Sequence, residues 1–175
     1  MSMQSPIQST DPLVHYNAVI PFAIAGMDGT NLSLAVTTTD KGLASIDYVH
    51  GLVSQNASDK FGEEVVSHLE RYFDDCLWRF DLPLDLFGTP FQQRLWQTLR
   101  EVPAGVTDTY GQLAHQLNSG AQAIGQACRR NPVPVIVPCH RIISLRGMGG
   151  YAGEVDGKKM SIKRALLAHE GYLGV

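Results

Sequence analysis

The chain has 175 residues, of which 44% are hydrophobic and 18% are charged, and its formal net charge is -3. This apolar content is enough to bury the core of one or two compact units, which excludes a disordered chain. The negative charge argues against a protein that coats nucleic acid by bulk charge, because such binding scales with the phosphates that Lys and Arg neutralise.

The first segment, residues 1–13, is rich in Ser, Gln, Pro and Thr, which predicts a loose N-terminal arm. No stretch approaches the roughly 18 apolar residues of a membrane span. The start of the chain also lacks the basic-then-apolar pattern of a secretion signal. We therefore expect a soluble cytoplasmic protein.

The three cysteines, Cys76, Cys128 and Cys139, form an odd set without CxxC spacing. This pattern indicates neither a disulfide framework nor a sulfur-rich zinc site, and it suits a reducing compartment. A lone cysteine is usually a small buried apolar residue, and we assign that role to Cys76 and Cys128.

Residues 15–53 are predicted to form strands, with apolar and polar residues alternating over 32–36 and a turn at 40–42, and this pattern indicates a hairpin-rich sheet. Apolar residues at helical spacing over 58–72 predict a helix that covers one side of this sheet. The stretch 83–88 breaks the periodic pattern, so we place a boundary near Asp85. It separates a sheet domain, 14–85, from a second domain, 86–175.

The second domain is predicted to be mainly helical. Thr89, Pro90 and Gln92 have the order of an N-cap, a first helical proline and a capping box. Two short helices over 110–117 and 121–130, joined by a tight turn, suggest a helix-turn-helix. On these residues alone, a plain pair of packed helices is the commoner structure.

The candidate nucleophile is Cys139, which follows the apolar run 133–137 and precedes His140. A free thiol has a pKa of about 8.5, so it needs a nearby base or cation to become reactive. If the segment is extended, Cys139 and His140 point to opposite faces and would communicate through a water. Glu170, at the end of a helix predicted over 161–169, is our choice to orient the imidazole. Without the Cys-His pair, an ordinary solvated residue near a helix end would be the preferred interpretation.

Two further features lie near Cys139. The glycine-dense loop 144–153 could wrap its backbone N–H groups around a flat polar ligand. Basic residues also crowd the C-terminal part, where any nucleic-acid surface should be sought. They are Arg129, Arg130, Arg141, Arg146, Lys158, Lys159, Lys163 and Arg164.

Five segments in register resemble the O6-alkylguanine-DNA alkyltransferase family. They are GTPFQQRLW (88–96), TYGQLA (109–114), NPVPVIVPCHRII (131–143), GYAG (150–153) and KRALLAHEG (163–171). The combination is highly specific and spans the C-terminal half, whereas the N-terminal half matches only in outline. The resemblance implies an α/β (α+β) fold, with a ribonuclease-H-like sheet domain followed by a helical domain that contains a helix-turn-helix.

The resemblance also implies chemistry. Cys139 would accept the alkyl group from guanine O6 once per molecule, activated through water by His140 and Glu170. Further matches to family positions are Tyr110, which would help to rotate the nucleotide and bind the departing guanine, Asn131, which would steady the turn, and Lys163. The pocket would be lined by the backbone carbonyls of Cys139 and Ile142, by Tyr151 and by the amide of Ala152.

The same resemblance implies a monomer that binds double-stranded DNA containing O6-alkylguanine, with O4-alkylthymine as a second substrate and cooperative binding left open. The base must be flipped to react, and a helix with small residues would lie in the minor groove. Its groove-facing positions would be Ala121, Ala123 and Gly125, and Arg129 and Arg130 could hold phosphates, although both could be a solvated helix end.

This chain departs from the family pattern in several places. Gln122 stands where most members carry an arginine that fills the hole left by the flipped base, the turn before it is about two residues short, and the stretch 153–161 is long. No match is present for the zinc ligands of some members, and no cofactor or metal is implied.

Three alternatives remain open at this point. One is a non-catalytic relative that binds alkylated bases, although such proteins replace the cysteine. Another is a hydrolase with a Cys-His-Glu triad, which would turn over small esters or amides. The third is a helix-turn-helix regulator, which should need a dimer and a palindromic site.

Overall fold

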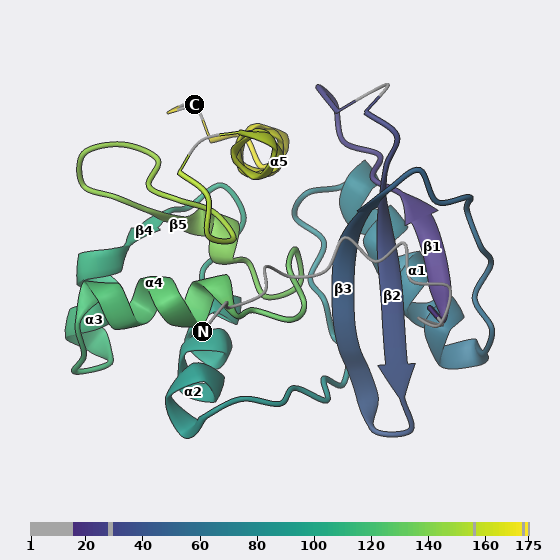
Figure 1. The fold of residues 1–175 in the computed structure, drawn as a ribbon, viewed down its shortest axis with the longest axis horizontal. Coiled ribbons are helices and arrows are strands. Elements are labelled where there is room, and N and C mark those ends of the chain that lie inside the picture. The colour runs from purple at the N-terminus through teal and green to yellow at the C-terminus, as the bar shows by residue number, and fades with distance from the viewer. Residues whose placement is uncertain (1–15, 28–29, 156, 173, 175) are drawn as a thin grey trace, which may run out of the picture.

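The computed structural model describes residues 16–27, 30–155, 157–172 and 174, so the arm expected at 1–13 lies outside the described residues. The elements form two groups in space (Figure 1). One contains a small antiparallel sheet and a helix, and the other contains four helices and a short parallel strand pair. The predicted mixture of a sheet region followed by a mainly helical region is confirmed.

The sheet has three antiparallel strands in the order β1 (Ala18–Pro21), β2 (Leu32–Thr39) and β3 (Gly42–His50). Asp40 and Lys41 form the predicted turn between β2 and β3, since Thr39 pairs with Gly42. Gly42 has φ +153°, and a Cβ there would lie 2.5 Å from the carbonyl oxygen of Pro83. Glycine is therefore required by a close approach of two backbones.

The stretch that follows Leu82, predicted as a linker, begins as a partner of this sheet. Leu43 N–H donates to the Pro83 carbonyl and Asp85 N–H donates to the Leu43 carbonyl, both at 2.9 Å. Farther along β3, Ile46 N–H donates to the carbonyl of Pro132, also at 2.9 Å. The sheet is thus hydrogen-bonded directly to the chain that leads to Cys139.

Helix α1 (Lys60–Asp74) covers one face of the sheet (Figure 1). Its N-cap is Asp59, whose carboxylate accepts from Gly62 N–H, one residue after the predicted start at Ser58. Val65, Leu69 and Tyr72 recur at helical spacing and are fully buried. The helix thereby carries Tyr72 into the centre of the molecule.

The helical group begins with α2 (Pro90–Arg100), where the predicted capping box between Thr89 and Gln92 is confirmed. Trp96 is buried, and its indole N–H donates to the carbonyl of Ala127 at 3.1 Å. This bond joins α2 to α4 (Ala121–Arg129), which packs on α3 (Tyr110–Gln116). Both short helices are confirmed, each ending one residue before the predicted limit.

The chain around Cys139 is not extended, contrary to the case considered above. Cys139–Arg141 form a 3-10 turn (η1), followed by β5 (Ile142–Ile143). Prolines at 132, 134 and 138 explain the difference, because proline cannot donate the hydrogen bonds of a strand ladder. β5 pairs in parallel with β4 (Asp108–Thr109), and this places Tyr110, the first residue of α3, beside the Cys139 segment.

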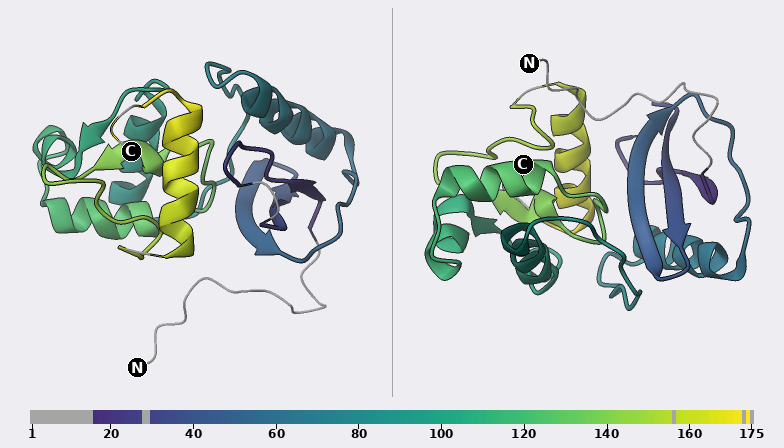
Figure 2. Two further views of the ribbon diagram at one scale, coloured as in Figure 1. Left: turned by 90° about the horizontal axis from the view of Figure 1, so that it is seen from above. Right: turned by 60° about the horizontal axis from the view of Figure 1, so that its bottom comes forward.

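The last helix, α5 (Lys158–His169), starts three residues before the predicted Ser161. It lies on the side of the helical group that faces the sheet and α1 (Figures 1 and 2). Ile162, Leu166 and Leu167 are buried as predicted. Within the described residues, no helix combines the length and the apolar composition that crossing a membrane requires.

Candidate active site around Cys139

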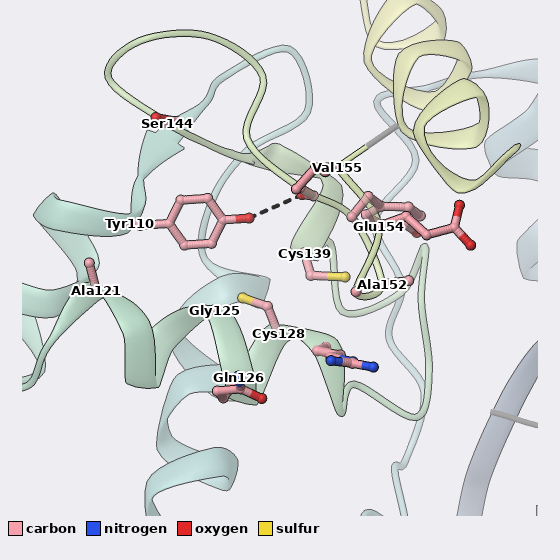
Figure 3. Close-up of a pocket in the computed structure, with 14 residues that line it drawn as sticks. Tyr110, Ala121, Gly125, Gln126, Cys128, Cys139, Ser144, Ala152, Glu154 and Val155 are labelled. Atoms are coloured by element: carbon pink, nitrogen blue, oxygen red, sulfur yellow. Dashed lines mark hydrogen bonds between the residues drawn. The ribbon is translucent and has the colours of Figure 1, made fainter. Parts of the chain in front are cut away.

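Cys139 lies at the wall of a cavity of about 470 Å³ and is only 6% exposed. The cavity is bounded by α4, by Tyr110 and by the loop that follows β5. Figure 3 shows Cys139 and Cys128 on segments that face each other, with Tyr110 beside them. A nucleophile in this position can be reached only by a group that enters the cavity.

Asn131 fixes the nucleophile and the turn that carries it. Its Nδ2 donates to Cys139 Sγ at 3.2 Å and to the Val137 carbonyl at 2.7 Å, and its Oδ1 accepts from Val133 N–H at 3.0 Å. Val135, inside this turn, has φ +74°, which is costly for a β-branched residue. The three bonds of Asn131 hold the backbone in that conformation.

The Cys139 thiol is protonated at rest. Burial raises its pKa above the ordinary value, and the Asn131 hydrogen bond and the nearby Lys163 charge lower it by less. The donors directed at the sulfur favour the thiolate once a base removes the proton. The site therefore needs a general base.

His140 is fully buried and is paired with Glu170, at 2.9 Å between Nε2 and Oε1. Because a carboxylate only accepts, Nε2 carries the proton and the Nδ1 lone pair is left as the acceptor. Nδ1 has no hydrogen-bond partner among the described residues. Burial lowers the pKa of His140 more than Glu170 raises it, so the ring is neutral at pH 7 and can take a proton.

Glu170 is the most heavily bonded side chain of the site. Arg141 donates from Nε to Oε2 at 2.9 Å and from an Nη to Oε1 at 2.7 Å, and the Tyr72 hydroxyl donates to Oε1 at 2.7 Å. Burial alone would raise the pKa of this carboxyl, but the hydrogen bond from His140 and the bonds and charge of Arg141 outweigh burial and hold it well below its usual range. Glu170 is thus an ionised, buried carboxylate, and the alternative of a solvated residue is wrong.

Lys163 is also fully buried, and its ammonium organises the glycine-dense loop. Nζ donates to the carbonyls of Ile142 at 2.6 Å, Met148 at 2.7 Å and Gly150 at 3.1 Å. Burial lowers the pKa of Lys163 to about 8. The expectation that the C-terminal basic residues share a surface is wrong for two of them. Lys163 is fully buried and Arg141 is only 8% exposed, so both face inward.

The structure brings together most of the predicted pocket residues. Tyr110, Tyr151 and Ala152 line the cavity with Cys139. The Tyr110 hydroxyl donates to the Gly150 carbonyl at 3.1 Å (Figure 3). Ile142 is not among the lining residues, since it is buried and its carbonyl accepts from Lys163.

Helix α4 presents a face of small residues to the mouth of the cavity. Ala121 and Gly125 line it, and a Cβ added at Gly125 would come within 3.9 Å of the Tyr110 ring. Gln122, Ala123 and Arg130 are exposed. Arg129 also lines the cavity and lies against Gly153, where a Cβ would approach its Nε to 2.5 Å.

Three residues were not predicted to lie at the site. Tyr72 bonds Glu170, the hydroxyl of Tyr48 lies 3.0 Å from that of Tyr151, and Cys128 is buried as predicted but also lines the cavity. The two tyrosines belong to the N-terminal region, and no local pattern signals a contact about a hundred residues away. Among the described residues, no three His, Cys, Asp or Glu side chains are grouped so that they could hold a metal ion.

The sequence and the fold of the chain are similar to those of known proteins. The family model described as 6-O-methylguanine DNA methyltransferase, DNA binding domain, matches residues 90–172. A methylated-DNA–protein-cysteine methyltransferase of Mycobacterium leprae is 47% identical over 98 residues, which are 54% of this chain and 59% of that protein. One of Shigella flexneri is 48% identical over 109 residues, covering 60% of this chain and 61% of that protein. The chain thus spans about three fifths of the length of these two relatives.

Other relatives match over more of their length. The methylated-DNA–protein-cysteine methyltransferase of Archaeoglobus fulgidus is 36% identical over 133 residues, covering 74% of this chain and 87% of that protein. The crystal structure of Mycobacterium tuberculosis OGT in complex with DNA superposes with a TM-score of 0.69 at 32% identity. That match covers 90% of this chain and 93% of the other, so it includes the N-terminal sheet region as well.

Proposed function

Since the chain belongs to the methylated-DNA–protein-cysteine methyltransferase family, we propose that it repairs DNA by moving the alkyl group of O6-alkylguanine onto Cys139. The proposal rests on one observation: His140, which directly follows the cysteine that borders the cavity, is buried and hydrogen-bonded to Glu170. Such a pair supplies a base and a fixed counter-charge for it, and these are what the protonated thiol needs.

The transfer is a single displacement. The Cys139 proton passes through a water to His140 Nδ1, and the sulfur forms a bond to the alkyl carbon as the bond from that carbon to O6 breaks. The electron pair stays on guanine, which takes up a proton to give the normal base. Glu170 stabilises the imidazolium, because its carboxylate is ionised and bonded to Nε2.

The product is a thioether, which no group of the site can reverse. His140 can remove a proton, but no proton transfer breaks the new carbon–sulfur bond. Each molecule would therefore act once. This stoichiometry distinguishes the alkyl transfer from a Cys-His-Glu hydrolase, in which water regenerates the cysteine.

Binding would place α4 in the minor groove of double-stranded DNA, with α3 and α4 acting as a helix-turn-helix. Base flipping is required because O6 is inaccessible within the stacked duplex, at a cost of a few kcal/mol. The small residues Ala121 and Gly125 lie next to the cavity, so a groove-bound α4 would hold the flipped base close to Cys139. Gln122 would enter the vacated stack, and Arg129 and Arg130 would face phosphates.

The remaining parts of the proposal concern the rest of the chain. Tyr110 would turn its hydroxyl from Gly150 to the departing guanine, and Ala152 would offer its amide to O6. The sheet with α1 would form a ribonuclease-H-like domain that ends near Asp85. A monomer suffices for all of these roles, because every group named comes from one chain.

The proposal is tested by incubating the protein with duplex DNA that contains O6-methylguanine. Mass spectrometry should find one methyl group on the peptide that bears Cys139, at a maximum of one per molecule in the presence of excess DNA. The peptides with Cys76 and Cys128 serve as internal controls, and Cys139→Ser should stay unmodified. An unmodified Cys139, or turnover of small esters without methylation, would refute the alkyl transfer.

A further inference from the structure

Tyr72 reaches the reactive centre from α1. It is completely buried, and its hydroxyl donates to Glu170 Oε1 at 2.7 Å, the same oxygen that accepts from His140 Nε2. His169 fixes the tyrosine from behind, with Nε2 2.8 Å from the Tyr72 carbonyl oxygen and its ring packed edge-on against the phenol. The phenol and the imidazole therefore share one carboxylate oxygen, which also accepts from an Nη of Arg141.

Tyr48 reaches the other side of the centre from β3. Its hydroxyl lies 3.0 Å from that of Tyr151, and Phe22 packs edge-on against its ring at 5.6 Å between centroids. Tyr151 and Cys139 line the same cavity, and a bond from the Tyr151 hydroxyl is the weakest of the influences that lower the pKa of the Cys139 thiol. A phenol has one hydrogen. If Tyr151 directs its hydrogen at the sulfur, Tyr48 must be the donor in the tyrosine pair.

We propose that Tyr48 and Tyr72 are positioning residues for the alkyl transfer: Tyr48 turns the Tyr151 hydroxyl toward Cys139, and Tyr72 sets how strongly Glu170 holds His140. This inference deepens the proposed function and rests on it. Both tyrosines precede residue 90, where the family-model match begins. The N-terminal region would thus contribute one hydroxyl that acts on Cys139 and one that acts on the His140–Glu170 pair.

The groups around the Cys139 sulfur determine how the Tyr48 hydroxyl affects deprotonation of the thiol. The ionisable groups near the Cys139 sulfur include Tyr151, Tyr110, Lys163 and Cys128, with Tyr48 behind Tyr151. Arg129 and Glu154 line the same cavity, and His140 is the next residue in the chain. Removing the Tyr48 hydroxyl frees the Tyr151 hydroxyl to rotate, and the Cys139 thiolate is then less stabilised by a hydrogen bond from Tyr151. A loss of about two- to tenfold in transfer rate follows, the range expected for one buried hydrogen bond. Deprotonation of Cys139 should then require a higher pH.

The Tyr72 hydroxyl affects the His140–Glu170 pair in a different way. Arg141, Tyr72 and Lys163 act on the His140–Glu170 pair. Without the Tyr72 hydroxyl, Oε1 accepts more strongly from His140 and favours the imidazolium. Arg141 still holds both carboxylate oxygens, so Glu170 stays in place. The acid limb of the transfer rate should therefore move to higher pH.

The experiment compares wild type, Tyr48→Phe, Tyr72→Phe and the matched control Tyr16→Phe. Tyr16 packs against the small cluster of Val19, Ala35 and Val49. Two profiles are measured from about pH 5 to about pH 10, a range that extends on the order of one pH unit beyond the ordinary pKa values of His and Cys. The first is the rate of single-turnover methyl transfer from O6-methylguanine in duplex DNA. The second is the rate at which iodoacetamide labels Cys139, followed on the peptide that contains this residue. Tyr48→Phe should move the labelling profile to higher pH, Tyr72→Phe should move only the acid limb of transfer, and the control should move neither.

Each outcome has a distinct meaning. If wild type transfers no methyl group, the proposed function fails, and the labelling profile alone still decides for or against Tyr48. If both variants keep the wild-type profiles, or lose rate in proportion to a loss of folded protein without any shift, the positioning roles are overturned. A double variant, Tyr48→Phe with Tyr151→Phe, should label like Tyr151→Phe alone, and additive effects would contradict the chain from Tyr48 through Tyr151 to the sulfur.

Discussion

Arg141 grips both carboxylate oxygens of Glu170 from a position two residues after the nucleophile. A third bond, from Arg141 to the carbonyl of Val102, anchors the guanidinium to the turn that follows α2. The turn that carries Cys139 and His140 is thereby fastened to the carboxylate that the imidazole needs. His140 and Glu170 are therefore held together as long as this ion pair is intact.

Replacing Arg141 by methionine should lower the free energy of unfolding by about 3 kcal/mol, because the buried Glu170 carboxylate would lose its charged partner. Urea unfolding at pH 7.5 measures the loss. Arg146→Met, at an exposed position of the next loop, is the matched control and should change stability by no more than about 0.5 kcal/mol. An Arg141→Met loss as small as that of the control would contradict the role of this pair.

Stability should fall on acidification in two stages. His140 has its pKa lowered by burial, and Glu170 has its pKa held below the usual range despite burial. The ordinary pKa is about 6.5 for His and about 4.3 for Glu. At pH values between the ordinary pKa and the lowered pKa of each group, the unfolded chain binds more protons than the folded chain. Both contributions are complete above the ordinary value and decline as pH falls toward the lowered one.

Urea unfolding in steps from pH 8 downward checks this dependence. The first decline should begin near the ordinary histidine pKa, about 6.5, and Glu170→Gln should remove the second. His115→Gln, at an exposed histidine of α3, should leave the curve unchanged. A free energy of unfolding that stays constant through both windows would be incompatible with a buried neutral His140 and an ionised Glu170.

Gly42→Ala should destabilise the sheet by about 1–3 kcal/mol, because the new Cβ would overlap the Pro83 carbonyl oxygen. Gly111→Ala makes the same chemical change inside α3, where the nearest atom lies at 3.9 Å. It should stabilise by about 0.5–1 kcal/mol, the helix preference for alanine. Thermal unfolding distinguishes the two, and equal shifts would show that Pro83 does not pack against Gly42.

Gln122→Arg should bind duplex DNA more tightly or repair it faster, since a guanidinium adds charge at the position that would enter the base stack. The slope of log affinity against log salt should steepen by about one. Gln97→Arg adds the same charge at an exposed position of α2 and serves as the control. If Gln122→Arg changes neither affinity nor rate, Gln122 does not occupy the stack.

Local patterns predicted the elements, and long-range contacts limited what could be inferred of the site. The capping box of Thr89 and Gln92 and the apolar spacing of α1 are written in neighbouring residues, and both were confirmed. Glu170 was predicted because it ends a recognisable helix near the Cys-His pair in a known family. Tyr48 and Tyr72 were not, because their partners lie 103 and 98 residues away and only tertiary packing unites them. The roles of the predicted site residues remain predictions until the variants are measured.

The single ammonium of Lys163 binds the carbonyl of Ile142 in β5 and the carbonyls of Met148 and Gly150 in the loop that follows β5. Many proteins shape such a loop around a captured cation and lose the shape when the ion is scarce. Here the cation is part of α5, so its effective concentration is fixed by the fold itself. The cation that binds these carbonyls is thus supplied by the helix itself, and no ion has to be taken from solution for this purpose.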